Sequence, residues 1–242
     1  MKVCITGATG ATGIKVVEQL LERGVSVKAV VRSAEKLHSL SQSYSQLEIV
    51  TAGISEMGVQ KLQNLVSDCD AVVSCLGHNI SLKGIFGKPR RLVTESMQKF
   101  SEAVLKLKSD RKIKFILMNT TANSNRDLNE KSTTGQSIVL GLLRVLLPPQ
   151  ADNEQAADYL RRKIGQDHPI IEWVAVRPDS LINQDTVTEY SIHQSPTRDP
   201  VFNPGKTSRI NVAHFMAELL TNETLWDQWK GQMPVQYNNE DQ

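Results

Sequence analysis

Three glycines near the amino terminus have a spacing suited to binding phosphates. The run Thr6-Gly7-Ala8-Thr9-Gly10-Ala11-Thr12-Gly13 follows a short apolar stretch and opens a helical pattern with one apolar face. The amino end of a helix presents unpaired backbone N–H groups and the positive end of the helix dipole, and glycines let a ligand approach the backbone. The pattern therefore predicts a diphosphate site, although a motif of this kind also fits an ordinary strand-to-helix turn.

A basic residue follows the second apolar run, where dinucleotide-binding folds contact the adenosine ribose. Residues 25–31 have the β-branched composition of a buried parallel strand, and Arg32 stands about 20 residues after Gly13. An acidic side chain at this place accepts a hydrogen bond from the 2′-hydroxyl, whereas an arginine pairs with a 2′-phosphate. Arg32 therefore favours NADP. Lys36, one turn further on, either adds positive charge or is a solvated helix residue.

Polar residues end the fifth predicted strand, where ligands of open parallel sheets bind. We expect Asn119 and Thr120 to lie near the nicotinamide, and the Thr121 hydroxyl to orient a substrate. The plainer alternative is that Thr120 and Thr121 only cap the strand exit and touch the nicotinamide amide. Hydride transfer needs chiefly orientation and exclusion of water, because the cofactor carries the chemistry. A reductase can therefore lack a strong acid.

Two other residues have the spacing of a proton-transfer motif. Tyr159 and Lys163 match Tyr-x-x-x-Lys, in which the two side chains share a helix face. Lys163, however, falls at the end of its helix, where a cation suits the dipole. A catalytic role for Tyr159 therefore stays open.

The other charged and titratable residues that could lie near the site have simpler structural interpretations. His78, just after Gly77, could approach a substrate, but a loop histidine with no evident partner is expected to be structural. Asp152, Glu154 and Asp158 are expected to form a solvated helix face. Arg177 either turns the chain beneath the nicotinamide or makes a buried ion pair.

The elements that must position these residues alternate between strands and helices. Such alternation predicts right-handed βαβ crossovers, and hence a Rossmann-type, doubly wound parallel α/β sheet. We expect one NAD(P)-binding domain over residues 1–242, with 120–150 and 183–242 as substrate-side additions that include a small carboxyl-terminal covering region. The predicted strands are 3–5, 25–31, 47–52, 70–77, 114–119 and 172–176, and the predicted helices begin at 14 and cover 33–40, 56–66, 90–108, 152–163 and 211–220.

One segment, residues 138–147, is apolar nearly all round. It is far too short to span a bilayer, which takes about 20 residues. One interpretation is a core helix. The other is a lid or a partner surface beside the active cleft, which would imply an apolar or aromatic acceptor.

Composition narrows the function classes. The 242 residues carry a net charge of +2 with both signs interspersed, which argues against a nucleic-acid partner. The amino terminus enters the first strand without the pattern of a secretory signal, which predicts a cytoplasmic protein. Cys4, Cys69 and Cys75 are expected to be reduced packing residues, and no metal-ligand spacing occurs.

Together, the glycine run, Val31-Arg32-Ser33, Asp70-Ala71-Val72-Val73 and Val176-Arg177-Pro178 resemble the atypical short-chain dehydrogenase/reductase family, in its NmrA-like branch. That branch includes biliverdin-IXβ/flavin reductases and NAD(P)H-binding proteins. The resemblance implies that Gly7, Thr9, Gly10, Ala11 and Thr12 hold the diphosphate, Arg32 and Ser33 the 2′-phosphate, and Leu76 and Gly77 the nicotinamide ribose region. One departure is Gly53-Ile54, where the family often has Gly-Asp near the adenine.

These observations predict an NADPH-dependent oxidoreductase that transfers hydride to a flavin, a quinone or a similar conjugated acceptor. The alternative is a regulatory protein that senses NADP(H) without turnover, which the weak set of acids and bases favours. The sequence leaves the acceptor, the oligomeric state and a protein partner open.

Overall fold

A computed structural model of the chain describes residues 1–78, 87, 89–107, 111–128, 130 and 133–239. In this part of the chain, eight strands form one sheet in the order β3-β2-β1-β4-β5-β6-β10-β8. All neighbouring strands are parallel except β8, which pairs antiparallel with β10. The sheet strands are β1 (Lys2–Thr6), β2 (Ser26–Val31), β3 (Leu47–Thr51), β4 (Ala71–Ser74), β5 (Ile113–Met118), β6 (Ile171–Pro178), β8 (Tyr190–His193) and β10 (Val235–Asn238).

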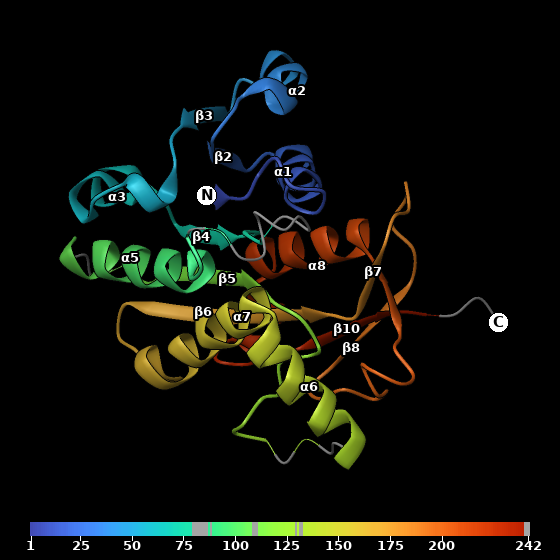
Figure 1. The fold of residues 1–242 in the computed structure, drawn as a ribbon. Coiled ribbons are helices and arrows are strands. Elements are labelled where there is room, and N and C mark those ends of the chain that lie inside the picture. Colours follow the sequence, from blue (N-terminus) through green and yellow to red (C-terminus); the bar gives the residue numbers. More distant parts are fainter. Residues whose placement is uncertain (79–86, 88, 108–110, 129, 131–132, 240–242) are drawn as a thin grey trace.

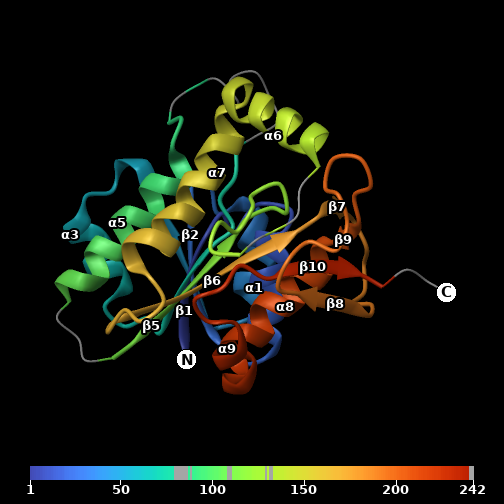
Figure 2. The ribbon, with the colours of Figure 1, turned by 90° about the horizontal axis from the view of Figure 1, so that it is seen from below.

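Helices cover both faces of this sheet (Figures 1 and 2). One face carries α1 (Gly13–Glu22), α8 (Arg209–Thr221) and α9 (Glu223–Trp229), and the other carries α3 (Val59–Val66), α5 (Leu92–Lys106) and α7 (Pro148–Tyr159). The other helical elements are η1 (Glu35–Leu37), α2 (His38–Ser43), η2 (Ile54–Glu56), α6 (Thr134–Leu146) and the π-turn η3 (Leu160–Ile164). The predicted doubly wound Rossmann fold is confirmed.

Alternation along the central strands explains why two cores form. Successive side chains of a strand point to opposite faces, so apolar residues at every position feed both layers. In β1, Val3 and Ile5 pack beneath α1 and α8, whereas Cys4 packs toward α3 and α5. In β6, Val174 and Trp173 divide in the same way.

The first crossover shows how local sequence sets the geometry of the glycine turn. On α1, Val16, Val17, Leu20 and Leu21 are buried against the sheet. The helix ends at Glu22, and Gly24, just beyond it, has a φ of +72°, a left-handed conformation that favours glycine. The chain returns directly into β2 alongside β1, which leaves both strands ending at the same edge.

The carboxyl-terminal part has more regular structure than the sequence indicates. The residues after the last predicted helix contain α9 and β10, and β10 extends the sheet beside β6. A small parallel sheet of β7 (Ser180–Ile182) and β9 (Lys206–Ser208) follows the end of β6. These strands have three or four residues each, too short for a periodic pattern to reveal them.

Candidate functional site

The glycine turn packs tightly between β1, β4 and α1. Gly7 has φ +73°, and a Cβ there would lie 2.4 Å from the Cys75 carbonyl oxygen. A Cβ at Gly13 would lie 2.1 Å from the Gly7 carbonyl oxygen. The backbone alone fits at both positions, which explains two of the three glycines.

The amino end of α1 faces this turn as the sequence predicts. Gly10 N–H donates to the Gly7 carbonyl at 2.9 Å, and Ile14 N–H donates to the Gly10 carbonyl at 3.0 Å. The N–H groups of residues 11–13 thus precede the helical hydrogen-bond ladder, as at any helix amino end. Thr9 is half-buried and Thr12 is buried, while Gly10 and Ala11 are exposed, so their backbone is open to a ligand.

The exit of β2 brings positive charge beside the turn. Arg32 and Ser33 are exposed immediately after β2. Lys36 reaches back from η1, and its Nζ lies 3.4 Å from the Thr9 carbonyl oxygen. Two basic side chains therefore lie at the strand exit next to the glycine turn, on the side where a bound dinucleotide carries its adenosine.

Polar groups from the β5 exit meet the first turns of α7. Asn119 is buried, and its Nδ2 donates to the Asn153 carbonyl at 3.0 Å. Its Oδ1 accepts from Thr120 N–H at 2.8 Å and from the Asn123 amide. Thr120 is half-buried at the surface of this cluster. Leu76 is half-buried and Gly77 is exposed. Both follow the neighbouring strand β4 at the same edge of the sheet.

Thr121 lies deeper than its neighbour. It is 4% exposed, and its backbone N–H donates to the Pro178 carbonyl at 3.2 Å. Burial raises the pKa of the Asp179 carboxyl, while the N–H groups of Gly205 and Ser180 and the Thr121 hydroxyl act in the opposite direction. Thr121 thus fastens the β5 exit to the segment after β6, and a catalytic role for it stays a prediction.

The expectation of a solvated face is wrong for Asp152. This carboxylate is 1% exposed and accepts hydrogen bonds from Val93 N–H at 2.8 Å and Thr94 N–H at 2.9 Å, at the amino end of α5. His78 Nε2 lies 2.9 Å from the same carboxylate. The sequence alone does not show that residues 78, 93 and 152 meet. Residue 78 follows β4, residue 93 lies in α5 and residue 152 lies in α7, so they are far apart along the chain.

Glu154 also has partners that the sequence does not reveal. Its carboxylate binds Arg126 of the loop after β5 and Arg144 of α6. The distance between Arg144 Nη2 and Glu154 Oε1 is 2.8 Å. These ion pairs hold α6 and the loop after β5 against α7.

Arg177 makes a buried ion pair, one of the two roles expected for it. The guanidinium is fully buried, and its two Nη atoms lie 3.0 and 2.6 Å from the two carboxylate oxygens of Glu130. It also donates to the carbonyls of Met233, Asn123 and Gln194. One side chain thereby fixes the loop after β5 relative to β6 and the carboxyl-terminal segment.

Tyr159 lies away from this cluster. It closes α7, whose first turns hold Asp152 and Asn153, so at 1.5 Å per residue it stands about 10 Å further along the axis. Lys163 is exposed within the π-turn η3. The structure does not bring this pair to the exits of β4 and β5.

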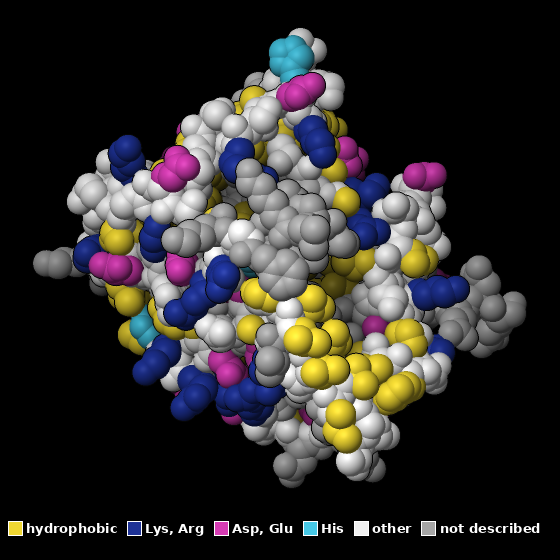
Figure 3. All heavy atoms as spheres, viewed as in Figure 1, with side chains coloured by type: hydrophobic (Ala, Val, Ile, Leu, Met, Phe, Trp, Pro, Cys, Tyr) yellow, Lys and Arg dark blue, Asp and Glu magenta, His cyan; other side chains and the backbone are white. Residues whose placement is uncertain are grey.

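Residues 138–146 of the apolar segment lie in α6 and expose a stripe instead of forming a core helix. Ile138, Leu142 and Leu146 are 66%, 56% and 54% exposed. Figure 3 shows apolar side chains gathered over α6. The core-helix interpretation is wrong for these three positions, because α6 uses Arg144 and its contacts with α7 to dock and leaves the stripe uncovered.

The three cysteines lie in the interior of the protein. Cys4, Cys69 and Cys75 are free and buried, as expected. Burial raises the pKa of Cys69 and of Cys75 to about 12, so these two are poor nucleophiles. Among the described residues, no cluster of three potential His, Cys, Asp or Glu ligands could hold a metal ion. None of the helices in the described ranges has the length and apolarity to cross a bilayer.

Several residues of this site could not be identified from the sequence. Asn123, Asn153 and Gln150 form the amide network, with Gln150 Nε2 donating to Asn123 Oδ1 at 2.7 Å. The one usable signal was the polar composition of residues 119–125, which follows a buried strand. The helix that supplies the partners begins some 30 residues later, and no local pattern joins the two.

Solved structures share this fold across nearly the whole chain. An oxidoreductase from Lactococcus lactis has a TM-score of 0.67 at 16% identity, covering 99% of this chain and 92% of that chain. A short-chain dehydrogenase/reductase from Veillonella parvula, solved with NADP, has a TM-score of 0.69 at 13% identity and coverage of 98% and 94%. The anaerobillin reductase ChuY from Escherichia coli O157:H7 has a TM-score of 0.68 at 15% identity and coverage of 100% and 99%.

Curated relatives match a shorter part of the chain. An uncharacterized chloroplastic protein of Arabidopsis thaliana is 45% identical over 74 residues, 31% of this chain and 26% of the relative. The chloroplastic protein TIC 62 of Pisum sativum is 37% identical over 79 residues, 31% of this chain and 15% of the relative. The matched regions thus span about a quarter or less of these relatives.

The family defined as NAD(P)H-binding matches residues 7–223, from the first glycine of the turn to the start of α9. This match confirms the predicted NAD(P)H-binding family, and the structure supplies the backbone turn and helix amino end that such a ligand needs. The chain therefore belongs to the NAD(P)H-binding family.

Proposed function

We propose that the protein is an NADPH-dependent oxidoreductase that reduces a flavin, a quinone or a similar conjugated acceptor. The observation that carries the proposal is the edge of the sheet at which the glycine turn, the basic β2 exit and the polar β5 exit lie together. A dinucleotide along this edge would have its diphosphate at Gly7, Thr9, Gly10, Ala11, Thr12 and Gly13. Its 2′-phosphate would lie near Arg32 and Ser33, and its nicotinamide end near Leu76, Gly77, Asn119 and Thr120.

The preference for NADPH rests on charge. Arg32 is exposed at the β2 exit, and Lys36 lies within reach of the turn at Thr9. A 2′-phosphate would gain a charge-assisted hydrogen bond there, which NADH cannot make. A neighbour of the same fold was solved with NADP.

The proposed acceptor follows from the surface beside the nicotinamide end. The exposed stripe of α6 ends at Leu146, and α7 then begins and supplies Gln150 to the amide network. An apolar or aromatic acceptor would cover this stripe while its polar edge meets Thr120, which is half-buried at the surface of the amide network. When bound, the reduced nicotinamide supplies the hydride, and the residues of this chain orient both molecules and exclude water.

The test is turnover of NADPH with a panel of flavins, quinones and aldehydes. NADPH oxidation that depends on an acceptor supports the reductase. Binding of NADPH without turnover of any acceptor contradicts it and supports the second candidate, a sensor of NADP(H) that acts on a protein partner. That candidate draws on the exposed α6 stripe, which a partner could also cover.

Cellular location is a separate matter. The cytoplasmic expectation stays a prediction, and the names of the partial relatives describe chloroplastic proteins. Localisation of the tagged chain in its own cells would decide between the two.

A further inference from the structure

The exit of β3 carries a carboxylate that the proposed function has not yet used. β3 pairs in parallel with β2, and Ala52 N–H donates to the Val31 carbonyl at 2.8 Å, so the two strands end side by side. The chain then turns through Gly53 into η2, which ends at Glu56. Because β2 lies between β3 and β1 in the sheet, this turn flanks Arg32 on the side away from the glycine turn.

The turn after β3 is anchored to the core. Ile54 and Met57 are buried in the apolar layer that α3 and α5 cover. Lys99 of α5 donates from Nζ to the carbonyls of Ser55 and Met57, at 2.9 and 3.4 Å. Since the Ile54 side chain is buried, the charged side chain that η2 offers to a ligand is that of Glu56, which is exposed.

The Glu56 side chain folds back across this turn. A Cβ at Gly53 would lie 3.2 Å from Glu56 Cδ and 3.3 Å from each carboxylate oxygen, so the carboxylate lies over the Gly53 backbone. This position is not that of a helix cap, because no side-chain hydrogen bond caps η2. Within the part of the chain that the structure describes, no donor meets this carboxylate. Both oxygens can therefore accept a hydrogen bond from a ligand.

The proposed cofactor would bring its purine to this place. With the diphosphate at the glycine turn and the 2′-phosphate at Arg32, the adenosine ribose lies at the β2 exit. The ribose carbon that carries the base is bonded to the carbon that carries the 2′-phosphate, so the base lies within one sugar ring of Arg32. The diphosphate takes the β1 side of the ribose. The base therefore extends toward the β3 exit.

We propose that Glu56 accepts a hydrogen bond from the exocyclic amino group of the adenine and thereby selects adenine over purines with an oxygen at C6. Adenine presents an N–H donor at this position. Hypoxanthine presents a carbonyl oxygen there, which a carboxylate repels. The contact is the same for NADPH and NADH, so it is separate from the contact of Arg32 with the 2′-phosphate. This inference rests on the proposed use of NADPH.

The test is calorimetric titration with NADPH and with its hypoxanthine analogue, reduced nicotinamide hypoxanthine dinucleotide phosphate. We expect the unchanged protein to bind NADPH at least about fivefold more tightly than the analogue, since the lost hydrogen bond is to a charged group. In Glu56→Gln this ratio should fall to about twofold or less, because an amide can donate to a carbonyl oxygen as well as accept from an amino group. The ratio cancels the effect of removing one negative charge near the phosphates.

Glu102→Gln is the matched control. It changes an exposed glutamate of α5 that pairs with Lys106, and it should keep the ratio of the unchanged protein. Equal affinity of the unchanged protein for the two nucleotides would overturn the inference, and so would a Glu56→Gln variant that keeps the full ratio. Either result leaves NADPH binding and the proposed function intact. If the unchanged protein binds neither nucleotide, the proposed function fails and this inference fails with it.

Discussion

At the scale of single residues, the glycine turn depends on the absence of a Cβ atom at Gly7 and at Gly13. Gly13 has no room for a Cβ, because the Gly7 carbonyl oxygen would lie 2.1 Å from it. The nearest groups are backbone atoms, which cannot swing aside as a flexible side chain can. Any side chain at Gly13 must therefore displace the turn from α1.

We expect Gly13→Ala to weaken NADPH binding by more than tenfold, since the diphosphate depends on the position of this backbone. Gly58→Ala is the control, because a Cβ at Gly58 meets nothing within 4 Å and its φ of −74° suits any residue. Titration of both variants with NADPH checks the expectation. Equal affinities for the two variants would show that the turn does not hold the cofactor.

Arg177 is the residue on which the loop after β5 depends. Replacing it with methionine leaves the Glu130 carboxylate buried without its bidentate partner. Breaking a buried ion pair by removing one partner costs about 3–5 kcal/mol. Urea unfolding should show a loss of this size for Arg177→Met. It should also show a smaller loss for the double variant Arg177→Met/Glu130→Leu, and an equal loss would contradict the pairing.

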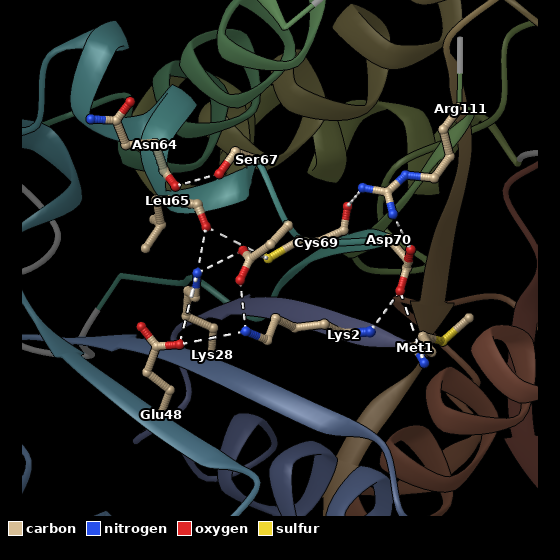
Figure 4. A network of polar contacts seen from close by, with 11 residues as sticks. Met1, Lys2, Lys28, Glu48, Asn64, Leu65, Ser67, Cys69, Asp70 and Arg111 are labelled. Atoms are coloured by element: carbon tan, nitrogen blue, oxygen red, sulfur yellow. Dashed lines mark hydrogen bonds and ion pairs between the residues drawn. The ribbon is translucent and has the colours of Figure 1, made fainter. Parts of the chain in front are cut away.

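At the scale of elements, the amino ends of the strands are joined by a charge network (Figure 4). Asp68 accepts from Lys2 Nζ at 2.6 Å and from Lys28 Nζ at 2.8 Å, and Lys28 is buried on β2. Asp70 accepts from Lys2 N–H and from Arg111. The network ties β1, β2 and the start of β4 together at the edge opposite the glycine turn.

This network predicts a pH dependence of stability. The Lys2 and Lys28 ammonium groups hold the pKa of the Asp68 carboxyl well below its usual value. A lowered folded-state pKa gives a contribution that is complete above the unfolded value, about 3.9, and is lost as the pH falls below it. The free energy of unfolding should therefore fall less steeply in acid for Asp68→Asn than for the unchanged protein. Parallel curves below pH 5 would rule this contribution out.

The exposed stripe of α6 predicts a substitution that affects function without affecting stability. Leu142 is 56% exposed, so Leu142→Ser should change the free energy of unfolding by less than about 0.5 kcal/mol. If the stripe receives an apolar acceptor, the KM for that acceptor rises while the Kd of NADPH is unchanged. Thermal unfolding and steady-state kinetics give the two readouts. An unchanged KM for every acceptor would remove α6 from the acceptor site.

At the scale of the whole molecule, the sequence was sufficient where the pattern is local and repeated. The runs that form β1, β2, β4, β5 and β6 are largely buried on both faces, and the helices between them have one apolar side, so their order predicts the parallel sheet. The short strands β7 to β10 carry too few residues for a period to be recognised. Their pairing comes from tertiary contacts such as the parallel register of Val235 with Arg177.

The same contrast between local patterns and tertiary contacts applies to the candidate functional site. The glycine turn and Arg32 lie within one βαβ unit, where spacing along the chain sets spacing in space. His78 and Asp152 stand 74 positions apart and meet only because β4 ends and α7 begins at one edge. Asp152 looks like a solvated helix residue from its neighbours, and its burial depends on the start of α5. The sequence therefore indicates the glycine turn and the β2 exit within one βαβ unit, but it does not indicate the contact between His78 and Asp152.

The central claim is that the edge formed by the glycine turn and the β2 exit binds NADPH in preference to NADH. Calorimetric titration of the chain with both cofactors tests it most directly, with Arg32→Ser and the control Lys61→Ser, an exposed lysine of α3, alongside. We predict one NADPH per chain, bound at least about tenfold more tightly than NADH, which corresponds to 1.4 kcal/mol or more. Arg32→Ser should lose most of this preference and Lys61→Ser should keep it. Binding of neither cofactor, or equal binding of both by the unchanged protein, would contradict the account.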